Sequence, residues 1–330
     1  MSNQVSSERP LVTFVLLAYN QEQYVRAAIQ GALAQDYEPL EIILSDDCSS
    51  DQTFDIMQEL ASSYQGPHRV RLRQSEVNLG TSLHLAAVSK ASSGELLVLA
   101  SGDDISVPTR TSELANAWLR HGKPTGVLHS KLLQFKEDIA HGKEVSLRYD
   151  VNRPVDIRWL LKGKGIPFMA PTSAFSKTIF EEFPQMPGGT FIEDGPLSAR
   201  ALLVGKVIAV DKCLVFQRIL KQTAGRGYSI LDPIKWNQLI ISRIISCVSV
   251  IRDVEGLKSS TSEHRRIQRA HAKIARRLSS FLMSGKSDPG TLSKLVFIIR
   301  FALCYPTSQR FLAKLHQALS LVGWEIKRPL

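Results

Sequence analysis

Short apolar runs alternate with amphipathic stretches over the first 135 residues, and this alternation limits the fold more than any other feature. Continuous β-branched and apolar runs, typical of strands buried on both faces, occupy 11–18, 40–45 and 95–100, and 70–73 predicts one more strand. Helical periodicity fills the intervening segments 21–34, 51–60 and 82–91. Strands and helices in this order predict an α/β fold with a mostly parallel central sheet flanked by helices.

The pattern changes in the second half of the chain. Residues 136–190 are rich in Gly and Pro and predict loops, whereas 195–203 predicts a helix and 207–218 a strand. Three helical stretches follow at about 233–255, 261–284 and 291–320. We therefore expect an α/β domain over 1–227 and a helical C-terminal region over 228–330.

The basic charge of the chain belongs to this helical region. The chain has 41 Lys+Arg and 31 Asp+Glu, a formal net charge of +10, but residues 1–230 are nearly balanced. The excess in 231–330 predicts either a solvated helix surface or contact with an anionic membrane. Nucleic acid is not expected as a partner, because no aromatic-interleaved basic strand and no zinc-finger spacing occurs.

Cysteine usage and hydropathy predict a cytoplasmic location, with the inner face of the membrane as a peripheral site. The four cysteines form no CxxC pair, which favours a reducing compartment. No apolar run reaches the roughly 18–20 residues of a spanning helix, and the polar first ten residues lack signal-peptide character.

Polar and acidic residues follow three of the predicted strands. These residues are Tyr19-Asn20, Asp46-Asp47 and Ser101-Gly102-Asp103-Asp104. Because ligands bind at the carboxyl ends of parallel strands, the three groups predict one site. Carboxylates there suit either a divalent cation or the donor groups of a nucleoside, and a nucleoside diphosphate with Mg²⁺ or Mn²⁺ satisfies both. The glycine-rich motifs GxGxxG and GxxxxGK[ST] are absent.

An ordered set of motifs resembles glycosyltransferase family 2 over about residues 10–225. The set comprises Leu17–Asn20, Gln35–Tyr37, Glu41–Asp51, Asn78–Gly80, Gly94-Glu95, Ser101–Asp104, Phe191–Gly195 and Val215–Leu220. The resemblance implies the nucleotide-sugar-binding GT-A fold. It also implies that the nucleoside pocket is lined by Ala18, Tyr19, Asn20 and Glu22. Asp47 would accept a hydrogen bond from the base, most often uracil, and Asn78 would shape the loop beside it.

The same resemblance assigns the diphosphate and metal region to the acidic turn. Asp103 matches the metal ligand of the family, with Gly102 and Asp104 beside it in the donor site. Ser101 stands where many members have a first Asp, so this chain lacks one acidic contact to ribose or metal. The Ser101 hydroxyl could bind the ribose instead.

Asp194 matches the catalytic base of the family. An inverting transfer needs a carboxylate that takes the proton of the attacking hydroxyl. Capping of the following helix is the alternative role, and the two roles are compatible. Arg218 could reach the diphosphate, or it could be an ordinary surface residue. His84 could approach a phosphate, although a packing role suits it better.

These residues predict a metal-dependent glycosyltransferase that uses a nucleotide-sugar, with UDP-sugar as the expected donor. The expected acceptor is a glycan or a lipid-linked acceptor in cell-surface polysaccharide or lipopolysaccharide synthesis. One alternative is a nucleotidyltransferase, which should carry a glycine-rich basic loop after the first strand. The other is a non-catalytic nucleotide-sugar-binding module that docks on a membrane.

Overall fold

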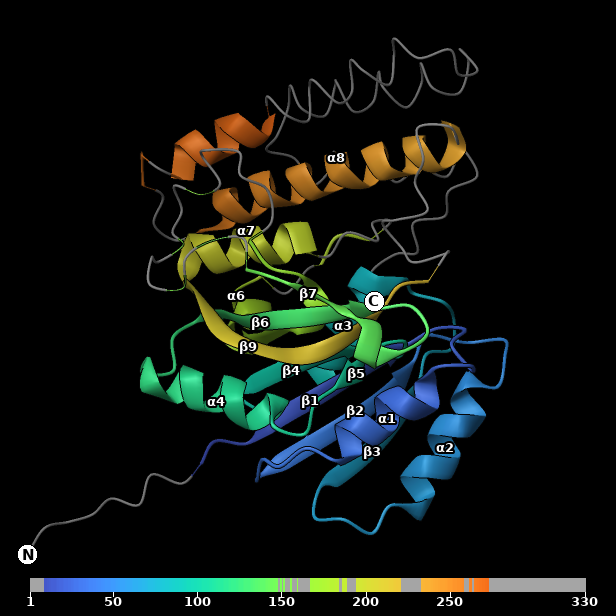
Figure 1. The fold of residues 1–330 in the computed structure, drawn as a ribbon. Helices are drawn as coiled ribbons and strands as arrows, with labels where there is room; N and C mark the ends of the chain where they lie inside the picture. Colours follow the sequence, from blue (N-terminus) through green and yellow to red (C-terminus); the bar gives the residue numbers. More distant parts are fainter. Residues whose placement is uncertain are drawn as a thin grey trace, which may run out of the picture.

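The computed structural model describes residues 9–147, 149, 151, 155, 159, 167–183, 186–188, 194–220, 233–257, 261–262 and 264–272 (Figure 1). These residues form a nine-stranded sheet with helices on both faces, and a long helix packs on the outer side of one of the two helix layers. None of the helices in these ranges has the length and apolar character needed to cross a bilayer.

The amino-terminal half of the sheet is parallel, as the sequence predicts. Its order is β3-β2-β1-β4, with β1 at Val12–Ala18, β2 at Leu40–Asp46, β3 at Arg69–Gln74 and β4 at Leu96–Ser101. Since β1 pairs with both β2 and β4, Ala18 lies opposite Asp46 and Leu17 lies opposite Ser101. The three polar strand ends therefore meet at one edge of the sheet.

Beyond β4 the sheet is mixed. β8 (Ser173–Ser176) pairs antiparallel with β4 and with β6 (Gly126–Phe135). The remaining strands are β5 (Ile105–Ser106), β7 (Lys143–Val145) and β9 (Lys206–Arg218). Within the less regular segment 136–190, the sequence pattern misses β7, β8 and the helix α6 (Thr178–Glu182), because elements of three to five residues are too short to show periodicity.

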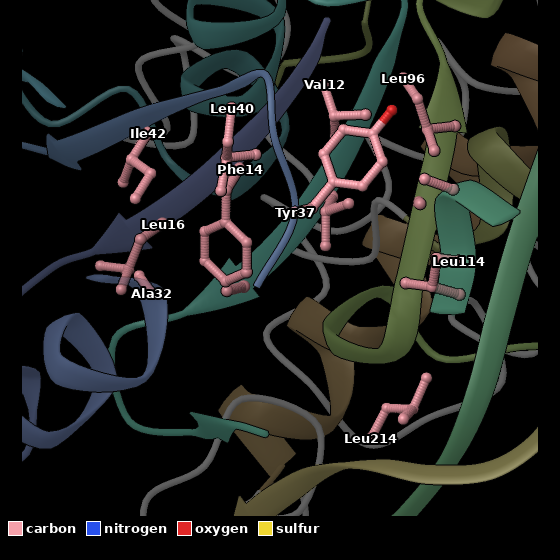
Figure 2. Packing of buried hydrophobic residues seen from close by; sticks show 14 of the residues in the cluster. Val12, Phe14, Leu16, Ala32, Tyr37, Leu40, Ile42, Leu96, Leu114 and Leu214 are labelled. Carbon is pink, nitrogen blue, oxygen red and sulfur yellow. The ribbon is translucent and has the colours of Figure 1, made fainter. Parts of the chain in front are cut away.

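Helices bury both faces of the parallel strands. α1 (Val25–Leu33), α2 (Thr53–Ser63) and α4 (Arg110–Arg120) cover the face that carries Val12, Phe14 and Leu16 (Figure 2). α3 (Thr81–Ala91), α6 (Thr178–Glu182) and α7 (Asp194–Val204) cover the opposite face, which carries Val15. Burial of each large apolar side chain stabilises the fold by about 1.5–3 kcal/mol, so these two layers hold the strand ends in place.

One more helix packs on the outer side of α7. It is α8 (Pro233–Gly256), close to the bounds the sequence predicts (Figure 1). Val250 and Val254 of α8 belong to an apolar cluster with Leu203 of α7 and with Ile267. Residues 264–272 are helical, as expected for that part of 261–284, whereas the predicted helix at 291–320 lies outside the described residues. The α/β domain and the first C-terminal helix therefore share a packed contact.

Candidate active site

The β1–α1 turn forms one side of the site and is bound to the β2–α2 loop. Asn20 has a φ of 51°, a left-handed conformation that Asn tolerates, and its Oδ1 accepts a hydrogen bond from Ser50 N at 2.9 Å. Oε2 of Glu22 accepts one from Gln52 N at 3.0 Å. Asn20 and Glu22, two of the four residues expected in the nucleoside pocket, thus hold the two loops together at this edge of the sheet.

Tyr19 and Ala18 end β1 with opposite exposure. The side chain of Tyr19 is 47% exposed, whereas Ala18 is buried and its carbonyl accepts a hydrogen bond from Asp47 N at 2.9 Å. An exposed aromatic ring at a strand end offers a flat apolar face, which suits stacking with a planar base.

Asp47 is buried, and its carboxylate binds the loop that follows β3. Oδ1 accepts a hydrogen bond from Leu79 N at 3.0 Å, and Oδ2 accepts one from Gly80 N at 2.8 Å. Gly80 has a φ of 75°, which glycine adopts without strain. Asp47 therefore organises the loop that carries Asn78. A carboxylate has about four acceptor positions, so capacity for a ligand N–H remains.

Asp46 and His84 are buried in the supporting structure. Asp46 Oδ2 accepts hydrogen bonds from Ser49 N at 2.8 Å and from Gln74 Nε2 at 3.1 Å, which join the β2–α2 loop to the end of β3. His84 Nε2 lies 2.7 Å from Ser45 Oγ, and burial lowers the pKa of its imidazole to about 4. The ring is therefore neutral at pH 7 and carries no charge for a phosphate.

The Ser101–Asp104 turn follows β4 and lies tightly against β1. Gly102 N donates a hydrogen bond to Leu17 O at 2.8 Å. A Cβ added at Gly102 would lie 2.7 Å from the Cβ of Ala18, closer than carbon atoms tolerate. The absence of a side chain at this position lets the acidic turn pack against the nucleoside side of the site.

Two adjacent carboxylates stand in this turn. Burial raises the pKa of Asp103, and a hydrogen bond from the Gln21 side chain and the charge of Arg218 partly oppose the shift. Burial, followed by the neighbouring charge of Asp103, holds the pKa of Asp104 well above its usual range. Both shifts mean that the protein alone does not fully compensate the two negative charges.

Arg218 ends β9 between two aromatic rings. Its guanidinium carbon lies 4.6 Å from the ring centroid of Phe135 and 5.0 Å from that of Tyr24. Its backbone N donates a hydrogen bond to Asp104 Oδ1 at 2.9 Å. Its buried Nε has no hydrogen-bond partner among the described residues. The rings thus hold a cation next to the acidic turn.

Asp194 is the first residue of α7 and is fixed by another segment. Its Oδ1 accepts a hydrogen bond from Ala170 N at 2.8 Å, at the start of the short helix η2 (Ala170–Thr172). Since β8 runs antiparallel to β4, with Ala174 opposite Val98, the start of β8 and the preceding η2 lie toward the carboxyl end of β4. The expected base is therefore anchored on the same side of the sheet as the acidic turn.

Comparison with known proteins identifies the family. The family model described as "Glycosyl transferase family 2" matches residues 13–183, which is more than half of the chain. The chain belongs to glycosyltransferase family 2. The structure of S. aureus TarS 1-349 in complex with UDP-GlcNAc resembles this family 2 chain with a TM-score of 0.62 and 16% identity. That likeness covers 93% of this chain and 84% of the TarS 1-349 chain, and it shows the GT-A fold expected from the sequence.

Curated relatives of this family 2 chain match over shorter segments. An uncharacterized protein of Mycobacterium tuberculosis is 38% identical over 120 residues, 36% of this chain and 34% of its own length. WfaP of Escherichia coli, a UDP-Glc:alpha-D-GlcNAc-diphosphoundecaprenol beta-1,3-glucosyltransferase, is 29% identical over 102 residues, 31% of this chain and 39% of its own length. The chain thus spans well under half the length of these relatives.

Glycosyltransferases with the GT-A fold commonly use a divalent metal ion. Within the described ranges, no group of three or more His, Cys, Asp or Glu side chains gathers into a cation site. Asp103 and Asp104 supply two carboxylates whose charges are only partly compensated. Mg²⁺ in nucleotide sites is bound by one or two carboxylates plus substrate phosphates, a donor set that this pair matches.

The sequence does not predict two further residues that interact with the acidic turn of this family 2 chain. Gln21 bonds Asp103 through its side chain, and its backbone N donates a hydrogen bond to Thr53 Oγ1 at 2.7 Å. Arg110 is wholly buried and interacts electrostatically with Asp104. Neither has a local sequence pattern that marks it as part of a site, so only the tertiary contacts reveal them.

Proposed function

We propose that the chain is an inverting glycosyltransferase that moves a sugar from a UDP-sugar to a hydroxyl of a glycan or lipid-linked acceptor. The observation that carries the proposal is the placement of Asp47, Asp103 and Asp194 on the same side of one sheet. They provide, in turn, an acceptor for the base, a carboxylate for the diphosphate region and a proton acceptor.

The nucleoside binds at the ends of β1 and β2 in this proposal. The exposed ring of Tyr19 stacks with the base, and the Asp47 carboxylate accepts the imide N–H of uracil. The hydroxyl of Ser101, at the end of β4, binds the ribose. The rest of the pocket is outlined by Ala18, Asn20, Glu22 and Asn78.

The diphosphate binds between the acidic turn and β9. Asp103 would hold Mn²⁺ or Mg²⁺, with Asp104 in support, and Gly102 lets this turn pack closely against Ala18 on the nucleoside side. When bound, the cation neutralises the charge that develops on the leaving nucleoside diphosphate. Arg218 adds a second positive charge from its place between two rings.

Asp194 acts on the acceptor. The acceptor oxygen attacks the anomeric carbon, the bond from that carbon to the diphosphate oxygen breaks, and the hydroxyl proton goes to Asp194. The hydrogen bond from Ala170 N fixes the orientation of the carboxylate before the acceptor arrives. A single displacement of this kind inverts the configuration at the anomeric carbon.

The biological setting is proposed from the relatives and from the charge distribution. TarS is known in complex with UDP-GlcNAc, and the name of WfaP specifies a UDP-sugar and a diphosphoundecaprenol acceptor. We extend this to cell-surface polysaccharide or lipopolysaccharide synthesis by a catalytic domain over 1–227. The basic residues after 228 would hold the enzyme at the anionic inner face of the membrane, where its lipid-linked acceptor lies.

The test combines a donor screen with one substitution. UDP-, GDP- and dTDP-sugars are screened with Mn²⁺ by thermal shift, and transfer is then measured with the stabilising donor. Asp194→Asn should keep nucleotide binding and lose roughly 10²–10⁴-fold in transfer rate. Asp211→Asn, an exposed aspartate on β9, is the matched control and should transfer normally. Full activity of Asp194→Asn would refute the base, and no response to any donor would refute the proposed function.

A further inference from the structure

Arg110, the first residue of α4, is a fully buried cation that the proposed reaction does not use. Its side chain is 0% exposed. Nη1 donates a hydrogen bond to Ser106 Oγ at 2.8 Å, and Nη2 donates to Leu99 O at 2.5 Å and to Pro171 O at 2.7 Å. These three acceptors come from β4, from β5 and from η2.

Packing alone does not account for this residue. Burial lowers the pKa of the Arg110 guanidinium to about 9, with the Asp104 charge opposing the shift. Its Nε has no partner among the described residues, so the burial is incompletely compensated. Apolar residues of similar volume often replace buried charges with no loss of stability. The arginine therefore needs an explanation other than filling space.

The positions of its partners supply that explanation. Leu99 and Ser106 flank the acidic turn on its two sides, so the guanidinium holds both arms of the segment that carries Asp103. Pro171 directly follows Ala170, whose N–H holds the carboxylate of Asp194. One planar group thus joins the donor side of the site to the anchor of the base.

We propose that Arg110 is a positioning residue that sets the separation between the Asp103 turn and Asp194. The proposal rests on the proposed function, because an in-line displacement needs the leaving group and the base held on opposite faces of the anomeric carbon. Arg110 touches neither donor nor acceptor. It acts through the carbonyls of Leu99 and Pro171, and a displacement of about 1 Å at such a site lowers the rate on the order of 10²-fold.

Two substitutions separate charge from geometry. Arg110→Met removes the charge and all donors, whereas Arg110→Lys keeps a charge near Asp104 but replaces the planar fork with one ammonium group. Glu41→Gln is the matched control. Glu41 is also buried in a hydrogen-bond network, with Thr13 and Ser93, but near the amino ends of β1, β2 and β4, away from the acidic turn.

Hydrogen exchange tests the link without reference to activity. In Arg110→Met, peptides covering 99–106 and 168–173 should both lose protection, whereas Glu41→Gln should leave both unchanged. Unchanged exchange at 168–173 in Arg110→Met would overturn the proposal. If that variant does not fold, Arg110→Lys decides in its place, with faster exchange at 168–173 expected and normal exchange overturning the link.

Kinetics test the consequence. Arg110→Lys should keep the donor KM within about threefold of the native value and lose about 10–100-fold in kcat per folded enzyme. Arg110→Met should also raise the donor KM and the Mn²⁺ concentration for half-activation. Native kcat in Arg110→Lys, or an equal loss in Glu41→Gln, would overturn the positioning role. Absence of transfer by the native chain would instead refute the proposed function, while hydrogen exchange still decides the link.

Discussion

The ion pair between Arg200 of α7 and Asp253 of α8 should dominate the attachment of α8. Arg200 Nε donates a hydrogen bond to Asp253 Oδ2 at 2.8 Å, and Nη2 donates to Oδ1 at 3.2 Å. The two side chains are 0% and 5% exposed. Arg200 Nη1 also donates to Phe183 O at 3.1 Å. Both charges are thus removed from water and depend on each other.

The magnitude follows from this burial. Asp253→Leu leaves a buried guanidinium with a carbonyl but without its counter-charge, and loss of one partner of a buried pair costs about 3–5 kcal/mol. Arg200→Met is milder, because burial already raises the pKa of Asp253 and the orphaned carboxyl can take up a proton. Replacing both residues, as Arg200→Met/Asp253→Leu, leaves no orphaned charge and should recover most of the loss.

Calorimetric melting measures these differences. At about 2–4 °C per kcal/mol for a domain of 150–250 residues, Asp253→Leu should lower Tm by at least about 6 °C. Arg26→Met is the matched control, because Arg26 bonds Glu59 through two nitrogens, at 3.0 and 2.6 Å, with both side chains exposed. It should leave Tm nearly unchanged. The reasoning would be refuted if Asp253→Leu had the native Tm, or if the double variant melted at a lower temperature than both single variants.

Two further predictions concern the site and the core. Gly102→Ala places a Cβ 2.5 Å from Gln21 Oε1 and should displace that side chain from Asp103. Calorimetric titration should then show Mn²⁺-dependent nucleotide binding weakened about 10–100-fold. Unchanged affinity would contradict this prediction. Burial lowers the pKa of His84 and His129 to about 4 from 6.5, so the unfolded chain takes up protons first as the pH falls. Each contributes about 3 kcal/mol of stability that is present above pH 6.5 and is lost toward pH 4. The midpoint of urea unfolding should therefore fall over this pH range, and it should fall less steeply in His129→Gln. An equal dependence of the midpoint on pH in that variant would argue against a buried, neutral His129.

The strands of the parallel half are the part of the fold that the sequence predicts best. β1, β2 and β4 are buried on both faces, so their apolar runs are continuous and their bounds match within two residues. β8 escapes prediction because its four residues, Ser-Ala-Phe-Ser, are buried by their neighbours and have no apolar run of their own. Its antiparallel pairing also makes the sheet mixed, which no local pattern indicates.

For the candidate site, the sequence predicts where the acidic residues lie but not what they contact. The strand-end position of Asp47, Asp103 and Asp104 is visible in the sequence, because each follows a strand whose direction is predictable. Their partners are not visible. The Asp47 carboxylate binds the backbone of Leu79 and Gly80, a contact between residues about thirty positions apart.

The sequence by itself determined the alternation of buried strands and helices, and with it the edge of the sheet where polar residues gather. It could do so because burial on a strand or helix leaves a period in neighbouring residues. Only the tertiary structure decided how Asp194 is held by Ala170, how Arg110 spans two segments and how α8 joins α7 through Arg200. These contacts join residues far apart in the chain, where one hydrogen bond leaves no periodic trace in the sequence.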